Sequence, residues 1–244
     1  MTATTYGLTV DRIVAAVCRL GASMAGVLPM AELLTTPSQG GQKHPNWPKW
    51  AASVLVFGLD HPTDLLPLDD WGGKYGTLGN RRLIGVGDRM IDWLSMDCGI
   101  RAHSLPYPPH AGGIFLKEAA VAAGLGIIGK NNLMVSPRFG AHLRFRALLL
   151  DAPLKGATAP PVFDPCHGCD APCRRRCPQE AFRDGHFNVD RCRRQMQRDY
   201  ACRQPPTNTG IGAAGLYLLR FCRICELSCP VGEKQPPADS QSSG

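Results

Sequence analysis

The sequence lacks two features that would place the protein in or beyond a membrane. No hydrophobic run in its 244 residues is long enough to span a bilayer. The apolar stretch from Ile13 to Leu28 is interrupted by Arg19 and has no convincing cleavage site, so it does not resemble a secretory signal. We therefore expect a cytoplasmic protein with no membrane contact, in which disulfide bonds do not supply the framework.

Size and composition set the next limits. Hydrophobic residues make up 44% of the chain, which is enough to bury a core, and the length suits one domain followed by a small module. Basic residues outnumber acidic residues by 27 to 20, which gives a formal charge of +7. Many of the arginines lie beside cysteines near the C-terminus: Arg174, Arg175, Arg176, Arg191, Arg193, Arg194, Arg198 and Arg203.

Eight of the 11 cysteines follow the spacing of a double iron–sulfur module. They form two runs that each end in Cys-Pro, and in two-cluster ferredoxins the last cysteine of each run binds the cluster of the other run. The pattern therefore predicts two [4Fe–4S] clusters. The first set of ligands is Cys166, Cys169, Cys173 and Cys229, and the second set is Cys177, Cys192, Cys222 and Cys225.

Other interpretations of the cysteines stay open at this point. Zinc binds Cys-x-x-Cys pairs, although structural zinc sites usually close with two such knuckles or add histidines. Three residues rather than two separate Cys169 from Cys173, which leaves a 3Fe or altered cluster open. Cys18 and Cys98 lie in apolar, helix-like segments and are predicted to be buried packing residues. Cys202 is a reserve ligand in case Cys192 does not bind.

The hydrophobic pattern predicts an α/β domain ahead of the cysteines. Apolar residues recur at helical spacing over 8–34, 82–96 and 115–123, and Gly124 ends the last of these helices. Residues 53–59 and 101–105 are predicted strands, and 133–136 and 141–151 are predicted to form a β-hairpin. The predicted divisions are an α/β domain over 1–155, a ferredoxin-like domain over 156–232 and a disordered tail over 233–244.

The segment Lys117–Leu133, which contains Gly124-Leu-Gly126 and Gly129-Lys-Asn131, resembles the epoxyqueuosine reductase family when it is taken with the double Cys-Pro module. That family is related to reductive dehalogenases and uses cobalamin with two [4Fe–4S] clusters. The resemblance covers residues 50–232 and implies a nitroreductase-like, cobalamin-binding fold for the first domain. It also implies an oxidoreductase in which electrons pass through the two clusters to a corrinoid.

The glycine-rich turn is the candidate contact with the corrinoid. Glycines at 124, 126 and 129 would let the backbone approach a large flat ligand closely, and Lys130 and Asn131 are candidate donors to corrin amides or phosphate. Dinucleotide sites use a similar Gly-x-Gly-x-x-Gly spacing after a strand, whereas here the spacing follows a predicted helix.

Two departures from the family concern the substrate. Where the family carries a proton-donating aspartate, an ungapped count places His110, whose proton is available near neutral pH. Tyr107 is a second candidate donor, because the related dehalogenases use a tyrosine. Family members that act on tRNA carry a further C-terminal helical domain that this sequence does not include. Both departures count against tRNA, which the resemblance keeps among the candidate partners.

The basic residues around the cysteines favour docking of an acidic electron donor such as ferredoxin or flavodoxin. The same arginines would also offset the negative charge of thiolate-bound clusters. Two other functions stay open. One is an electron-transfer or corrinoid-reducing protein without a substrate of its own, and the other is a flavin-binding iron–sulfur protein.

Overall fold

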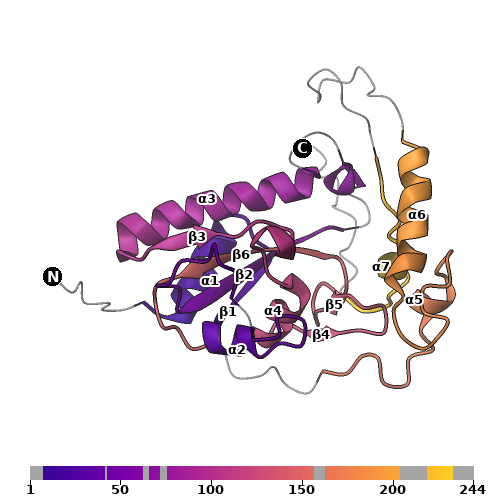
Figure 1. Ribbon diagram of the computed structural model, residues 1–244, viewed down its shortest axis with the longest axis horizontal. Coiled ribbons are helices and arrows are strands. Elements are labelled where there is room, and N and C mark those ends of the chain that lie inside the picture. Colours follow the sequence, from indigo (N-terminus) through magenta and orange to yellow (C-terminus); the bar gives the residue numbers. More distant parts are fainter. Residues whose placement is uncertain are drawn as a thin grey trace, which may run out of the picture.

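A four-stranded antiparallel sheet forms the centre of the computed structural model, which describes residues 8–41, 43–62, 66–71, 76–156, 163–203 and 219–232 (Figure 1). The strand order is β1-β2-β6-β3. These strands are β1 (Met24–Pro29), β2 (Ser53–Asp60), β6 (Leu143–Leu150) and β3 (Ala102–Ser104). A second, two-stranded sheet pairs β4 (Ile127–Ile128) with β5 (Met134–Val135).

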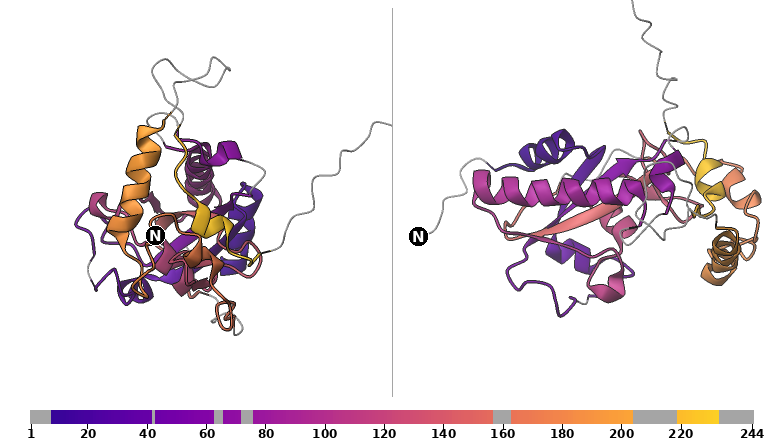
Figure 2. Two further views of the ribbon diagram at one scale, coloured as in Figure 1. Left: turned by 90° about the vertical axis from the view of Figure 1, so that its right-hand side faces the viewer. Right: turned by 90° about the horizontal axis from the view of Figure 1, so that it is seen from above.

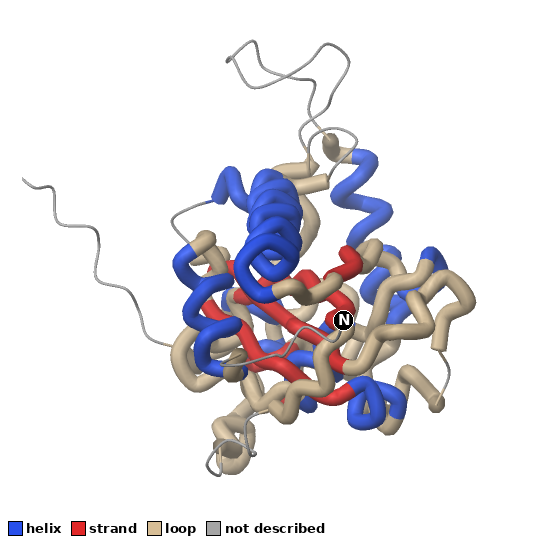
Figure 3. Tube along the Cα trace, turned by 90° about the vertical axis from the view of Figure 1, so that its left-hand side faces the viewer, coloured by secondary structure: helices blue, strands red, loops and turns tan. Residues whose placement is uncertain are grey.

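Helices cover both faces of the central sheet because its middle strands are apolar on both sides. Along β2, Val54 and Val56 face one core while Leu55 and Phe57 face the other, as the two-residue period of a strand requires. The first core includes α2 (Met30–Leu34) and α4 (Leu116–Ala122), and the second includes α1 (Val10–Arg19) and α3 (Leu78–Cys98). Figure 3 shows the helices on either side of the strands.

The longest helix, α3, confirms the helix predicted over 82–96 and extends it at both ends. Its first turn is capped by Thr77, whose hydroxyl accepts a hydrogen bond from the Asn80 N–H at 3.1 Å. It ends at Gly99, which has a φ of +65°. Neither this helix nor any other in the described ranges is long and apolar enough to cross a membrane.

The single helix predicted over 8–34 is wrong, because the chain changes structure after α1. Gly21 adopts a φ of +113°, which ends the helical turn, and residues 24–29 then pair with β2 instead of continuing a helix. Apolar residues on both sides of this segment fit a strand buried on both faces as well as a helix, so periodicity alone did not separate the two.

The predicted β-hairpin over 133–151 is also wrong. Only an isolated bridge joins Ser136 to Gly140, while β5 pairs with β4 and β6 pairs with β2 and β3. The other predicted elements are confirmed with small shifts in their ends: β2, β3, and α4, where Gly124 takes a φ of +77° after the helix.

The cysteine-rich segment lies at one end of the central sheet, at the right in Figure 1 and in the right-hand view of Figure 2. Its helices are α5 (Pro172–Arg175), α6 (Val189–Ala201) and α7 (Ile224–Leu227). Short 3₁₀ helices η1 (Leu66–Asp69) and η2 (Pro109–Ala111) belong to loops of the α/β part. The ferredoxin-like fold and the boundary at 155 stay predictions, since 157–162 and the predicted tail at 233–244 lie outside the described residues.

Gly26→Ala is expected to destabilise the protein. A Cβ built at Gly26 would lie 2.7 Å from the carbonyl oxygen of Ala123, so β1 and α4 would have to separate. Overpacking of this kind costs about 1–3 kcal/mol of unfolding free energy. Gly85→Ala in α3 is the control, because the nearest atom there is the flexible Arg89 side chain at 3.5 Å. In thermal denaturation, the midpoint should fall for Gly26→Ala and should not fall for Gly85→Ala. Equal midpoints for the two variants would contradict the close packing of β1 on α4.

Candidate metal centre and the ion pairs that hold it

One hollow brings together the four cysteines that the spacing assigned to the first cluster. Its wall contains Cys166, Cys169, Cys173 and Cys229. Burial raises the pKa of Cys173, and the neighbouring thiols raise it further. The α/β part contributes Lys130, Asn131 and Val135 to the same wall. The first run of cysteines therefore meets the last cysteine of the second run beside the glycine-rich turn.

The remaining four predicted ligands form a second group. Burial raises the pKa of Cys225 to about 12, and the nearby Cys222, Glu226, Cys192 and Cys177 add to this shift. Burial also raises the pKa of Cys192, as do the thiols of Cys177 and Cys222. Such mutual effects require the side chains to lie near one another, since charge interactions weaken with distance. These four cysteines therefore lie near one another, and their role as the ligands of a second cluster stays a prediction.

The chemistry of these two groups fits a polynuclear iron–sulfur cluster. Within the described ranges, no three His, Cys, Asp or Glu side chains converge closely enough to hold a single metal ion. Four thiols spaced around one hollow suit a cluster of several metal ions better than a single ion. Metal ligands must be thiolates, and the raised pKa values of the buried cysteines mean that a positively charged group is needed to keep them deprotonated.

Backbone N–H groups point at two of the sulfurs. The N–H of Lys130 donates to Cys166 Sγ at 3.3 Å, and the N–H of Ala181 donates to Cys177 Sγ at 3.3 Å. Hydrogen bonds to ligand sulfurs are one of the levers by which proteins set cluster potentials. Each group therefore receives at least one such bond from the chain.

Lys130 and Asn131, predicted to bind the corrinoid, contact the cysteine-rich segment. The ammonium of Lys130 donates to the Cys169 carbonyl at 2.9 Å, and the Asn131 side chain donates to the Cys225 carbonyl at 3.4 Å. Arg174 returns a hydrogen bond to the Lys130 carbonyl at 2.6 Å. These bonds join the glycine-rich turn to both cysteine runs, and contact with a corrinoid stays a prediction.

The glycines of this turn have structural reasons of their own. Gly124 needs its positive φ to end α4. A Cβ on Gly126 would collide with the Val135 carbonyl, and one on Gly129 would lie 2.7 Å from the Val135 side chain. Close packing of the turn on β5 therefore accounts for glycine at these positions, whatever ligand lies nearby.

The two candidate proton donors lie on neighbouring turns at the surface. Tyr107 is 55% exposed, and the guanidinium of Arg146 lies 5.4 Å from the centre of its ring. His110 is exposed in η2. Tyr107 is also close enough to Arg144 to help raise the pKa of that guanidinium. Tyr107 thus lies near the ion pairs described next, and proton donation by either Tyr107 or His110 stays a prediction.

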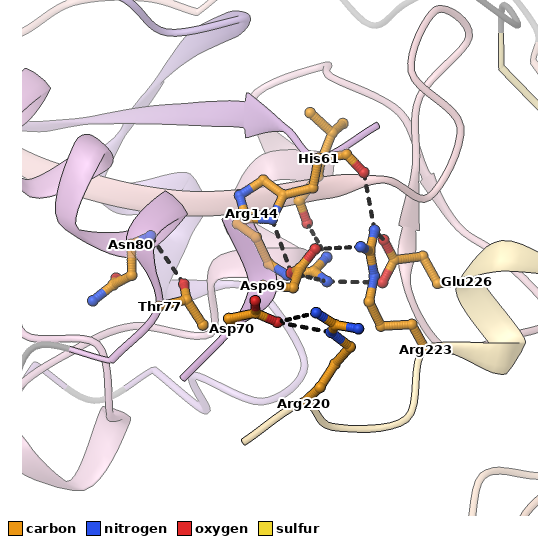
Figure 4. Close-up of polar contacts among 10 residues, drawn as sticks. His61, Asp69, Asp70, Thr77, Asn80, Arg144, Arg220, Arg223 and Glu226 are labelled. Atoms are coloured by element: carbon orange, nitrogen blue, oxygen red, sulfur yellow. Dashed lines mark hydrogen bonds and ion pairs between the residues drawn. The ribbon is translucent and has the colours of Figure 1, made fainter. Parts of the chain in front are cut away.

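A buried group of ion pairs joins the central sheet to the second cysteine run (Figure 4). Asp69 contacts His61 Nδ1 at 2.9 Å, accepts from Arg144 at 3.0 Å and is paired with Arg223. Glu226 accepts from Arg144 at 2.9 Å and is also paired with Arg223. Arg223 donates in addition to the His61 carbonyl at 2.9 Å. We call these five residues the arginine–carboxylate network.

Mutual neutralisation lets these charges lie inside the protein. Burial would raise the pKa of Asp69, but the His61 hydrogen bond and the charges of Arg144 and Arg223 outweigh it, so this pKa is lowered. Burial would likewise lower the pKa of Arg144, but Glu226 and Asp69 raise it. Breaking one partner of a buried ion pair leaves an uncompensated charge and costs about 3–5 kcal/mol.

Sequence analysis missed this network because its members are far apart along the chain. Asp69 and Arg223 are separated by 154 positions. Two signals were present: Arg223 and Glu226 each follow a predicted cysteine ligand, and Arg144 alternates with Leu143 and Phe145 in a strand. Neither signal identifies the partner. Of the other cysteines, Cys18 and Cys98 pack against the core but are only partly buried, and Cys202 is exposed.

Comparison with known proteins agrees with the resemblance seen in the sequence. No protein-family model matches the chain. An epoxyqueuosine reductase from Synechococcus sp. (strain CC9605) is 31% identical over 195 residues, which cover 77% of this chain and 58% of the relative. The chain is homologous to the epoxyqueuosine reductases. The enzyme of the same name from Staphylococcus aureus (strain NCTC 8325 / PS 47) is 27% identical over 50% of this chain and 30% of its own length.

Solved structures of epoxyqueuosine reductases share the mixed α/β fold. The Bacillus subtilis enzyme superposes with a TM-score of 0.62 at 20% identity, over 92% of this chain and 65% of that chain. An epoxyqueuosine reductase bound to a modified tRNA stem loop gives 0.62 at 19% identity, over 90% and 64%. A reductive dehalogenase studied for B12-dependent dehalogenation gives 0.54 at 19% identity, over 73% and 27%. The chain thus spans about three fifths of the first epoxyqueuosine reductases it matches.

Asp69→Asn is expected to lower stability near neutral pH by about 3 kcal/mol, as for other broken buried pairs. The folded-state pKa of Asp69 is below its ordinary value. Its carboxylate therefore stabilises the fold above the unfolded pKa of about 3.9, and this contribution is lost as pH falls through the folded value. Urea denaturation between pH 7 and pH 3 should show the gap between parent and variant closing in acid.

Asp70→Asn is the matched control, because Asp70 pairs with the half-exposed Arg220 at 2.7 Å. Exposed pairs contribute about 0–1 kcal/mol, and any acid sensitivity of the rest of the molecule is common to both variants. Equal losses for the two variants at neutral pH would contradict the role given to the network.

Proposed function

We propose that the protein is an iron–sulfur, corrinoid-dependent reductase of the epoxyqueuosine reductase type. One observation carries this proposal: Cys166, Cys169, Cys173 and Cys229 line one hollow, while the pKa values of Cys192 and Cys225 are raised by Cys177 and Cys222. The first set also lies against the glycine-rich turn that carries the sequence resemblance. In this proposal each set binds one [4Fe–4S] cluster, and the α/β part binds cobalamin.

Homology supports the class of reaction. The relatives are named epoxyqueuosine reductases, and a neighbour in fold is linked to B12-dependent dehalogenation. When bound, the clusters would supply one-electron carriers and the corrinoid a strongly reducing cobalt centre. Among the chain's own residues, Lys130 and Asn131 would hold the turn against both cysteine runs, and the network would hold Cys222 and Cys225 in place.

The substrate of this proposal is an epoxide-bearing nucleoside in tRNA. One epoxyqueuosine reductase of similar fold was solved with such a tRNA stem loop. Tyr107 or His110 would donate the proton that accompanies reduction, since both are exposed to an incoming substrate.

The same exposure favours a second candidate function. Catalytic acids usually lie in clefts where burial and neighbouring charges adjust their pKa. Tyr107 is more than half exposed, and His110 is exposed as well. A protein that reduces or carries a partner's corrinoid, without a substrate of its own, would need no enclosed proton donor.

Iron and cobalt counts test the cofactors. Anaerobically purified protein should hold about eight irons per chain and should take up cobalamin with a cob(II)alamin EPR signal. Cys173→Ser and Cys192→Ser should each disturb one cluster of about four irons, and each should leave the EPR signal of the other cluster. Cys98→Ser is the control, because Cys98 belongs to neither group. Zinc instead of iron, or a released flavin instead of cobalamin, would overturn the proposal.

Activity of the reconstituted protein distinguishes the two candidate functions. With an epoxyqueuosine-modified stem loop as substrate, loss of a general acid should slow turnover by about 10²–10⁴-fold. Tyr107→Phe and His110→Ala are the two variants, and cobalamin uptake should be unchanged in both. Normal turnover in both variants would remove them as proton donors. No turnover even in the parent, with intact clusters and bound cobalamin, would favour the corrinoid-reducing protein.

A further inference from the structure

The second cysteine group reaches the surface at a hollow of about 310 Å³ between α6 and α7. Gln195 and Asp199 of α6 line one side, and Ile224 and Leu227 of α7 line the other. Cys222 forms part of the wall and is an exposed cysteine. The Cys222 N–H donates to the Asp199 carboxylate at 2.8 Å, which fixes the wall to α6. A molecule seated in this hollow would lie directly against a predicted cluster ligand.

Exposed apolar side chains lie on both helices beside the hollow. Ile224 is 38% exposed and Leu227 is 44% exposed. On α6, Met196 and Val189 are 40% and 47% exposed, and their spacing of seven residues puts them on one face of the helix. Exposed large apolar side chains that gather on adjoining elements are typical of protein interaction sites.

The edge of the hollow is basic. Arg194 and Arg198 are exposed on α6 and one helical turn apart, so they lie on the same face. Gln195 and Asp199 are the residues of α6 that line the hollow. At 3.6 residues per turn, Arg198 lies on one side of these two residues around the helix and Met196 lies on the other. Arg220 stands on the opposite rim, with its guanidinium paired to Asp70. Exposed arginines on α6 beside exposed apolar side chains suit a protein partner whose surface carries both apolar and acidic residues.

The two cysteine groups lie at different distances from the α/β part. In the first group, Cys166 Sγ accepts from the N–H of Lys130 in the α/β part, whereas the second group includes Cys192 on α6, at the end of the molecule away from the central sheet (Figure 1). The second group is therefore the nearer one to an external protein at α6. An electron that enters at this hollow would therefore pass from the solvent side of α6 toward the α/β part.

We propose that the hollow and the exposed face of α6 form the docking surface for an acidic one-electron donor protein of the small iron–sulfur class. The inference rests on the proposed function, since it assumes a cluster on Cys177, Cys192, Cys222 and Cys225. One electron leaves the reduced donor and is taken up by that cluster, and no proton or leaving group moves. The arginines speed the encounter, and the apolar residues hold the complex.

Binding of an acidic [2Fe–2S] ferredoxin to the full chain with its clusters tests the docking surface. Calorimetry at low ionic strength should give a Kd that is at least about tenfold weaker for the double variant Arg194→Glu/Arg198→Glu, because attraction becomes repulsion at two sites. Leu227→Ala should also weaken binding, and without changing its salt dependence, since the lost contact is apolar. Arg82→Glu, a single charge reversal at an exposed position on α3, is the control and should bind normally.

Stopped-flow reduction adds a second readout on the same proteins. Reduced ferredoxin should reduce the double variant at least about tenfold more slowly at low salt, while reduced methyl viologen should reduce parent and variant equally. Unchanged ferredoxin binding in the double variant would overturn the docking surface. The docking surface would also be overturned if the double variant lost binding to an anticodon stem loop but still bound ferredoxin. The surface would then be a nucleic-acid site. Absence of iron from the parent chain would refute the proposed function itself, and would be seen before either assay.

Discussion

The arginine–carboxylate network is the interaction on which the cysteine-rich end of the molecule depends. Two arginines and two carboxylates, with His61 behind them, cross from the end of the sheet to the segment that carries Cys222 and Cys225. Two of its residues directly follow predicted ligands in the chain. Charges of this kind are tolerated inside a protein only when each has its partner, so the network either forms as a whole or is strongly unfavourable.

A second connection supports the first cysteine group. The turn after α4 is built from glycines that pack on β5, and this packing brings Lys130 and Asn131 against both cysteine runs. The two connections use different physics. One is a set of buried charges, and the other is close backbone packing with a few hydrogen bonds. Together they hold short helices that have little apolar core of their own, since no residue of α6 is fully buried.

Spacing along the chain was sufficient to predict the two cysteine sets, because the ligands of one cluster lie mostly close together in the sequence. Three ligands of the first set lie within eight residues, and Cys-Pro marks the fourth ligand in each run. The buried strand β2 and helices α3 and α4 were predictable for a similar reason, since their apolar residues recur with a clear period. The period failed at residues 24–29, where a strand buried on both faces resembles the end of an apolar helix.

What the sequence determined by itself is therefore local: the spacing of the cysteines, the position of the glycine-rich turn, and the resemblance to the epoxyqueuosine reductases, which comparison with a homologous chain confirmed. Only the tertiary structure decided how these parts meet. It placed Asp69 and Arg144 beside Arg223 and turned Lys130 and Asn131 toward the cysteines. The reason is physical: a charge or an amide in the sequence requires a partner, but folding decides which one, and here it joins residues from 39 to 154 positions apart.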